Sequence, residues 1–317
     1  MSWSYIQSIF FIAGGLVLFL YGIKIMSDGL KVIAGDKMKS FLEKSTSNRF
    51  LAIITGFFVT GIIQSSTAAT VMVVGFVNAG LLTLKQAIGV IMGANVGTTL
   101  TAQIISFKID NFIPIIMLVG LILYAFFKKQ NTKNIGVVLL GFGMLFFGLS
   151  AISGTLGSFA ENARFQTILT TFQNPFFAVL AGFIFTAITQ SSTATIGIVV
   201  ALFVGGIDLN FNTAICLVLG SYVGTCLTAM IAAIPANRES KRAALAHVLF
   251  NVFGCIVFGS LIVIFPSTLN WIQSTWSDGA RQIAMFHTFF NIANVILLLP
   301  FIKQFEFILK KIIPDKI

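Results

Sequence analysis

Long apolar stretches, separated by short polar segments, run along almost the whole chain. Seven of them approach the roughly 20 residues that a helix needs to cross a bilayer core. They lie near residues 5 to 27, 86 to 107, 111 to 127, 135 to 152, 212 to 234, 243 to 265 and 284 to 302. Because a helix satisfies its own backbone hydrogen bonds in lipid, the pattern predicts an all-α polytopic membrane protein with seven full crossings.

The same pattern occurs twice. Residues 56–68 read GFFVTGIIQSSTA and residues 182–194 read GFIFTAITQSSTA, with nine of thirteen positions identical at an offset of 126 residues. Each QSST is followed by a second shared element, GANVGTT at 93–99 and GSYVGTC at 220–226. Three crossings in each copy, an odd number, predict that the second copy is inverted in the membrane. The predicted units are residues 1–133 for the first repeat, 134–266 for the inverted repeat, and 267–317 for a terminal transmembrane helix and cytoplasmic tail.

The stretches that carry QSST have a different shape. Phe50 to Ile63 is apolar for 14 residues, about 21 Å of helix, which is shorter than a core of roughly 30 Å. A second apolar run of similar length follows QSST and reaches Asn78. We therefore expect a re-entrant hairpin with the polar motif at its tip, and a second such hairpin from Asn174 to Gly206 entering from the opposite face.

Composition and charge agree with a membrane protein. Hydrophobic residues make up 57% of the chain and charged residues only 9%, whereas soluble domains have about 25% charged residues. The net charge of +10 comes from basic residues scattered among the loops, so we expect no nucleic-acid partner. With the N-terminus outside, every basic residue except Lys108, Arg164 and Arg281 faces inward. The positive-inside rule thus predicts a multi-pass protein of the cell (inner) membrane with its C-terminus in the cytoplasm.

The two hairpin tips are the strongest candidates for a binding site, because they would meet near the membrane midplane. Their residues are Gln64, Ser65, Ser66, Thr67, Gln190, Ser191, Ser192 and Thr193. The second half-helix of each hairpin starts at QSST, so its free N–H groups and positive dipole end favour an anion. Hydroxyl groups donate to an oxyanion, while their lone pairs and the Gln carbonyl coordinate a hard cation. The alternative is that these residues only pack between helices.

The GANVGTT and GSYVGTC elements add candidate sodium ligands. Paired glycines permit local unwinding, so we expect discontinuous helices whose freed carbonyls bind sodium together with side chains. Those side chains are Asn95, Thr98, Thr99 and Thr225, with Thr101 and Thr228 left open. No Asp, Glu, Lys or Arg lies in the middle of a predicted crossing; Lys24 and Asp28 sit at an inner edge. We therefore expect no fixed positive charge at the site, and co-bound sodium to balance the anion.

Taken together, these motifs resemble the type II sodium-phosphate cotransporter family. The resemblance covers nearly the whole chain and includes the run KRAALAH at 241–247 and HTFFN at 287–291. It implies phosphate binding by both QSST tips. It also implies a sodium role for the tips. Together with the candidates from the two glycine-bearing elements, the predicted sodium ligands are Gln64, Ser66, Asn95, Thr98, Thr99, Gln190, Ser192 and Thr225. Where the family usually has Asn and Thr or Ser, this chain has Tyr222 and Cys226, which bears on one sodium site or on the stoichiometry.

The expected function is sodium-coupled symport of inorganic phosphate into the cell by alternating access between the two tips. Sodium would be the coupling ion, with no other metal and no cofactor. The open alternatives are transport of another small oxyanion and a non-transporting membrane phosphate sensor. The two histidines do not assemble a catalytic constellation, so we expect no enzyme. They share helical faces with asparagines (His247 with Asn251, His287 with Asn291), which favours hydrogen bonds between helices over a metal site.

Two further expectations concern partners. Many bacterial relatives in the resembled family carry a soluble domain like the phosphate-regulation protein PhoU after the membrane part. The printed sequence contains no such segment, so we expect that regulator to be missing or separate. The lipid bilayer is the other partner, and a homodimer is left open.

Overall fold

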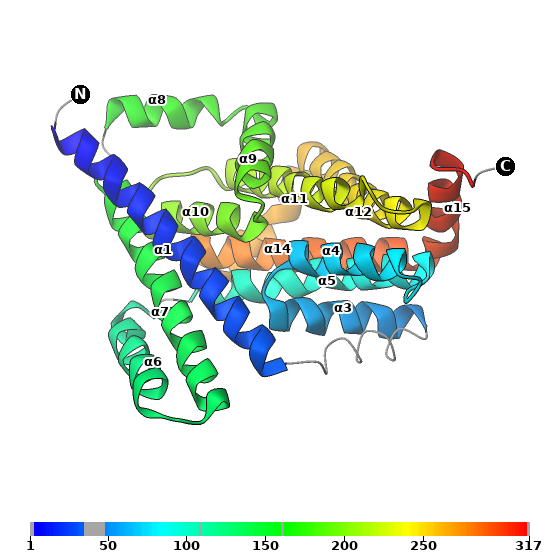
Figure 1. Cartoon of the computed structure of the whole chain (residues 1–317). Helices are drawn as coiled ribbons and strands as arrows, with labels where there is room; N and C mark the ends of the chain where they lie inside the picture. Colours follow the sequence, from blue (N-terminus) through cyan, green and yellow to red (C-terminus); the bar gives the residue numbers. More distant parts are fainter. Residues whose placement is uncertain (1–2, 35–47, 108, 160–161, 316–317) are drawn as a thin grey trace.

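The computed structural model describes residues 3–34, 48–107, 109–159 and 162–315, and that part of the chain is helical without strands (Figure 1). The helices are α1 (Trp3–Ala34), α3 (Arg49–Ile63), α4 (Ser66–Asn78), α5 (Leu84–Ile105), α6 (Ile113–Phe126), α7 (Gln130–Gly157), α8 (Ala163–Thr171), α9 (Pro175–Thr189), α10 (Ser192–Val204), α11 (Phe211–Ala233), α12 (Arg238–Ile264), α13 (Asn270–Thr275), α14 (Gly279–Leu298) and α15 (Ile302–Ile312). The all-α polytopic class predicted from the sequence is confirmed.

Six of the described helical segments are long and apolar enough to cross a membrane, and a seventh is reached only if the bent pair Phe165–Thr171 and Pro175–Thr189 counts as one span. This set differs from the predicted one at residues 111 to 127. Helix α6 has 14 residues, about 21 Å, which is too short to cross a core of roughly 30 Å by itself. Only Ile113 and Gly120 are buried on α6, so its apolar surface faces outward, toward the place that lipid would occupy.

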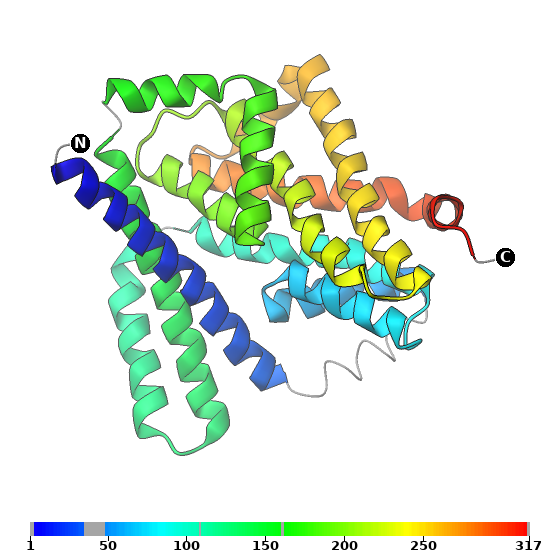
Figure 2. The same cartoon turned by 45° about the horizontal axis from the view of Figure 1, so that its top comes forward.

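Helices α1 and α7, which occupy equivalent places in the two repeats, pack against each other in opposite directions. A Cβ built at Gly22 would lie 2.6 Å from the carbonyl oxygen of Gly141, and one built at Gly148 would lie 2.5 Å from that of Gly15. Gly15 and Gly141 are 126 positions apart, as are Gly22 and Gly148. Adding or subtracting 126 therefore turns the contact of Gly22 with Gly141 into the contact of Gly148 with Gly15. This is the relation expected for two helices related by an approximate two-fold axis. Figures 1 and 2 show the pair slanting side by side past the bundle.

The predicted discontinuity in α5 and α11 is wrong. Both helices run unbroken through GANVGTT and GSYVGTC. Their glycines instead allow another helix backbone to approach: a Cβ at Gly93 would lie 1.9 Å from the carbonyl oxygen of Ile53 on α3, and one at Gly220 would lie 1.9 Å from that of Val179 on α9. Close helix packing in membranes uses small residues in this way. The carbonyls of these segments are therefore not freed for sodium.

The two hairpins are present as helix–break–helix elements. Helices α3 and α4 have 15 and 13 residues, and α9 and α10 have the same lengths. In Figure 1 the start of α3 and the end of α4 lie at the right, near α15. Helix α10 runs from the tip of its own hairpin toward the left. The orientation prediction also used Lys37, Lys39, Lys44, Lys108 and Lys316, which lie outside the described residues.

Candidate functional site

Each QSST tip is a sharp reversal built on an unusual backbone conformation. Gln64 and Gln190 end α3 and α9 with φ values of 56° and 54°, and they are the non-glycine residues with positive φ in the described chain. This left-handed conformation is uncommon for non-glycine residues and is typical of functional sites. The Gln64 amide is held in place, since it donates to the Gly61 carbonyl and accepts from Thr101 Oγ1 at 2.6 Å.

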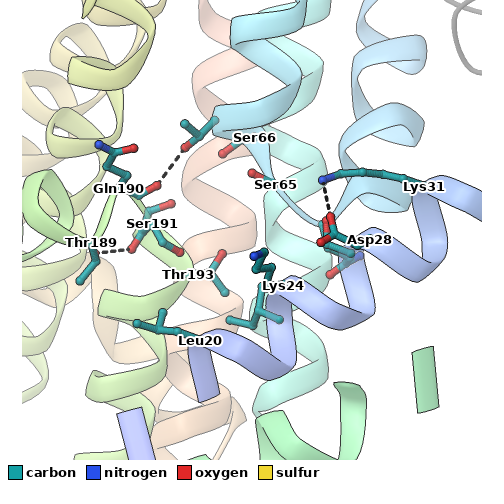
Figure 3. A pocket seen from close by; sticks show the side chains of 15 residues that line it. Leu20, Lys24, Asp28, Lys31, Ser65, Ser66, Thr189, Gln190, Ser191 and Thr193 are labelled. Carbon is teal, nitrogen blue, oxygen red and sulfur yellow. Dashed lines mark hydrogen bonds and ion pairs between the residues drawn. The ribbon is translucent and has the colours of Figure 1, made fainter. Parts of the chain in front are cut away.

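The two tips meet. Thr67 Oγ1 donates to the backbone carbonyl of Gln190 at 3.2 Å, joining residues 123 positions apart. All eight QSST side chains line one cavity of about 290 Å³, together with residues of α1. Figure 3 shows Ser65 and Ser66 on one side of this space, with Gln190, Ser191 and Thr193 on the other. The eight residues selected from the sequence therefore surround a single cavity, which we call the outer cavity.

The inner rim of the outer cavity is rich in hydrogen-bond donors. Ser65 and Ser191 are the N-caps of α4 and α10, and their Oγ atoms accept the backbone N–H of Ala68 at 3.1 Å and of Ala194 at 3.2 Å. Neither Oγ donates to another group among the described residues, so its hydroxyl hydrogen is available to the cavity. Two helix N-termini also direct their dipoles here. Hydroxyl donors beside helix N-termini form a surface that suits an anion.

The expectation of no fixed positive charge at the site is wrong. Lys24, Asp28 and Lys31 of α1 line the outer cavity, and Figure 3 shows Lys24 beside both tips. Their position in the sequence placed these residues at the edge of a crossing. In the structure α1 slants past the tips (Figure 1), and its three charged residues line the cavity. Sequence reasoning missed them as site residues; the available signal was their spacing of four and three, which puts them on one helical face.

A second and much smaller space of about 10 Å³, which we call the inner void, adjoins the tips. It is lined by Ser66, Asn95, Thr98, Ser192, Tyr222, Thr225, His287 and Asn291. This volume is about that of one water-sized sphere, so it suits a single small ion or water molecule. Ser66 and Ser192 line both this inner void and the outer cavity. The two spaces are thus adjacent and separated by one serine from each tip.

Several side chains turn their donor groups away from the inner void. Thr98 and Thr225 donate their hydroxyl hydrogens to the carbonyls of Ala94 (3.1 Å) and Ser221 (3.0 Å). Since a hydroxyl has only one hydrogen, the oxygen lone pairs are what each threonine can offer. Asn95 and Asn291 likewise direct an N–H to the carbonyl four residues earlier on their own helix.

The oxygen of Asn291 is of particular interest, because its Oδ1 atom is buried and has no hydrogen-bond partner in the described structure. A buried acceptor without a donor is costly and calls for a cation or an ordered water. Oxygen ligands are what hard cations prefer. The inner void is therefore chemically suited to sodium, with ligands from side chains rather than from unwound backbone.

The remaining predicted residues divide between the two spaces. Gln64 and Gln190, predicted for both ions, line the outer cavity only. Thr99 lines neither space and bonds the Val96 carbonyl at 2.7 Å. Tyr222, which stands where the first repeat has Asn95, places its hydroxyl 2.6 Å from His287 Nδ1. The predicted hydrogen bonding between helices is thus present at His287, but not at His247, whose two ring nitrogens are buried without a partner among the described residues. In the described residues no group of three or more His, Cys, Asp or Glu side chains could hold another metal.

Comparisons with known proteins identify the class. A family model described as Na+/Pi-cotransporter matches the chain twice, over residues 18–154 and 151–290. YqeW of Bacillus subtilis (strain 168), an uncharacterized protein, is 33% identical over 302 residues, which cover 95% of this chain and 97% of YqeW. No solved structure matches the chain. The chain belongs to the Na+/Pi-cotransporter family and is a multi-pass membrane protein.

Two other relatives have more informative names. YjbB of Escherichia coli (strain K12), whose name proposes inorganic phosphate export, is 28% identical over 302 residues, which cover 95% of this chain and 55% of YjbB. The chain therefore spans about half the length of that relative. The human Sodium-dependent phosphate transport protein 2B is 37% identical over 95 residues, which cover 29% of this chain and 14% of the human protein.

Proposed function

We propose that this protein moves inorganic phosphate across the membrane together with sodium, with phosphate in the outer cavity and sodium in the inner void. The observation that carries the proposal is that Ser66 and Ser192 line both spaces. A donor-rich rim that suits an anion thus lies directly against a void lined mainly by hydroxyl and amide side chains, which suits a cation. Membership of the Na+/Pi-cotransporter family supports phosphate and sodium as the two ions.

The proximity of the two sites provides a physical reason for coupling. Two opposite unit charges about 6 Å apart attract by about 3 kcal/mol at an effective dielectric constant of about 20. Such a free energy changes the affinity of one ion for its site by roughly 100-fold when the other ion is bound, and the effect is reciprocal. Phosphate would then bind well only when sodium is present, which is the requirement for a symporter.

Transport would follow alternating access around this site, with the second repeat inverted relative to the first and the N-terminus outside. The antiparallel packing of α1 and α7 supports an inverted arrangement. Under an inward sodium gradient we propose net phosphate uptake. Export is the second candidate, because the name of YjbB points to it; a symporter reverses when the combined ion gradients reverse.

The test is uptake of radiolabelled phosphate into proteoliposomes, with sodium or potassium outside. Sodium-dependent uptake is expected for the wild type, and its loss for Ser65→Ala and Ser191→Ala, because each change removes a donor of the outer cavity. Ser274→Ala is the matched control, since Ser274 is exposed on α13 and bonds only the Trp271 carbonyl among the contacts seen. Phosphate flux that ignores the sodium gradient in both directions would refute the coupling.

The same preparation separates the alternatives. If phosphate is not transported but sulfate or another small oxyanion is, the fold and the site stand with a different cargo. If phosphate binds the purified protein and no flux occurs under any gradient, symport is refuted and the result favours the membrane phosphate sensor.

A further inference from the structure

Three charged residues of α1 line the outer cavity, and they are not equivalent. Lys31 Nζ lies 3.1 Å from Asp28 Oδ1, so these two side chains form an ion pair whose charges cancel. Lys24 makes no ion pair or hydrogen bond among the described residues. The two tips contribute no charged side chain to the lining. The cavity therefore carries one uncompensated positive charge, and Lys24 supplies it.

The position of Lys24 relates this charge to the anion site. Figure 3 shows its side chain next to Thr193 and below Ser65, and all three residues line the same cavity. The hydroxyl groups of Ser65 and Ser191 and the N-terminal ends of α4 and α10 face the same space. An ammonium group has three donor hydrogens and no acceptor, so it complements the charge and the acceptor oxygens of an oxyanion.

We propose that Lys24 binds the transported anion directly and is its fixed counter-charge. This inference rests on the proposed function, because it names a further binding residue of the same site. An ammonium on one side and the sodium of the inner void on the other would bracket the anion between two positive charges. Part of the neutralisation then comes from the protein, and the cavity prefers a dianion over a monoanion of the same shape.

The test compares Lys24→Gln and Lys24→Arg in proteoliposomes with Lys128→Gln as the matched control. Lys128 is an exposed lysine between α6 and α7, outside the cavity. A charge-assisted hydrogen bond lost from the site predicts a rise in the KM for phosphate of about 10- to 100-fold in Lys24→Gln. Lys24→Arg, which keeps the charge, should recover most of the affinity, and Lys128→Gln should resemble the wild type.

A pH series distinguishes anion binding from a structural role. Phosphate gains its second negative charge as pH rises, so the ratio of the Lys24→Gln KM to the wild-type KM should grow with pH. The other charged groups of the cavity, Asp28 and Lys31, are unchanged in this variant. A KM within about twofold of the wild type at every pH, or an equal rise at all pH values, would overturn the proposal.

Failure of the proposed function gives a different result. If the wild type shows no sodium-dependent phosphate flux, symport is refuted, and equilibrium binding of radiolabelled phosphate to the same purified variants still decides the role of Lys24. Weaker binding to Lys24→Gln than to Lys128→Gln supports the role; equal binding refutes it. Size-exclusion profiles of all variants establish that each one is folded.

Discussion

Replacing Thr98 by valine tests whether the inner void binds sodium. Valine has nearly the shape of threonine, so the change removes an oxygen from the void without opening a cavity. The hydrogen bond lost from Thr98 Oγ1 goes to the Ala94 carbonyl of the same helix, and α5 stays helical without it because that bond adds to the backbone ladder. The main consequence is the loss of one oxygen ligand.

The size of the effect follows from the kind of interaction. A hydrogen-bond or ion contact to a charged group contributes about 1.5–3 kcal/mol. Since about 1.4 kcal/mol corresponds to a tenfold change in an equilibrium constant, the sodium concentration for half-maximal phosphate uptake should rise about 10- to 100-fold. At saturating sodium the maximal uptake rate should return toward that of the wild type, because the anion site is intact.

The chain supplies a close control in the next residue. Thr99 is also a buried threonine of α5, but its hydroxyl bonds the Val96 carbonyl at 2.7 Å and it does not line the void. Thr99→Val should therefore leave sodium activation within about twofold of the wild type. Both variants are measured as phosphate uptake against sodium concentration. Equal shifts in the two variants, or no shift in Thr98→Val, would show that sodium binds elsewhere.

Two further changes test the packing. Gly93→Ala should lower the free energy of unfolding in detergent by about 1–3 kcal/mol, because the new Cβ would lie 1.9 Å from a backbone carbonyl oxygen of α3. Gly75→Ala is the control and should be neutral or slightly stabilising, because nothing lies within 4 Å of its Cβ. A Gly93→Ala protein as stable as Gly75→Ala contradicts the packing argument. Arg242→Gln should speed amide hydrogen exchange in the C-terminal segment, because the buried Arg242 guanidinium donates to the Ile313 carbonyl at 2.8 and 2.6 Å. Unchanged exchange would mean that these hydrogen bonds do not fix the segment to α12.

Much of the site was predictable because its signals are local. The lengths of the apolar runs predicted helices, and the polar QSST between two short runs predicted a break at Gln64 and Gln190, where the backbone turns left-handed. The repetition of the motif at an offset of 126 residues predicted a pair of tips, and two short hairpins that enter from opposite faces are expected to meet near the midplane. The eight residues around the outer cavity follow from these facts.

Other predictions failed where local signals compete with packing. Glycines in GANVGTT weaken an isolated helix, which led to the expectation of unwinding, but contact with α3 requires these glycines inside a continuous helix. The run from 111 to 127 has the composition of a crossing, yet its helix starts at Ile113 and ends at Phe126. The composition of a segment does not specify the residues at which its helix begins and ends.

The sequence alone determined the membrane class, the two copies and the polar residues that could bind ions, because each of these depends on which residues are neighbours along the chain. Only the tertiary structure decided how those residues divide between the outer cavity and the inner void. The chemistry of the inner void depends on which hydrogens are already used: the threonines and asparagines donate to carbonyls of their own helices, and their oxygen lone pairs stay available. The lining of the outer cavity depends on the slant of α1, which brings Lys24 to tips that follow it by 40 residues and more. Contacts between segments that are distant in the sequence therefore determine the lining of the inner void and the position of Lys24.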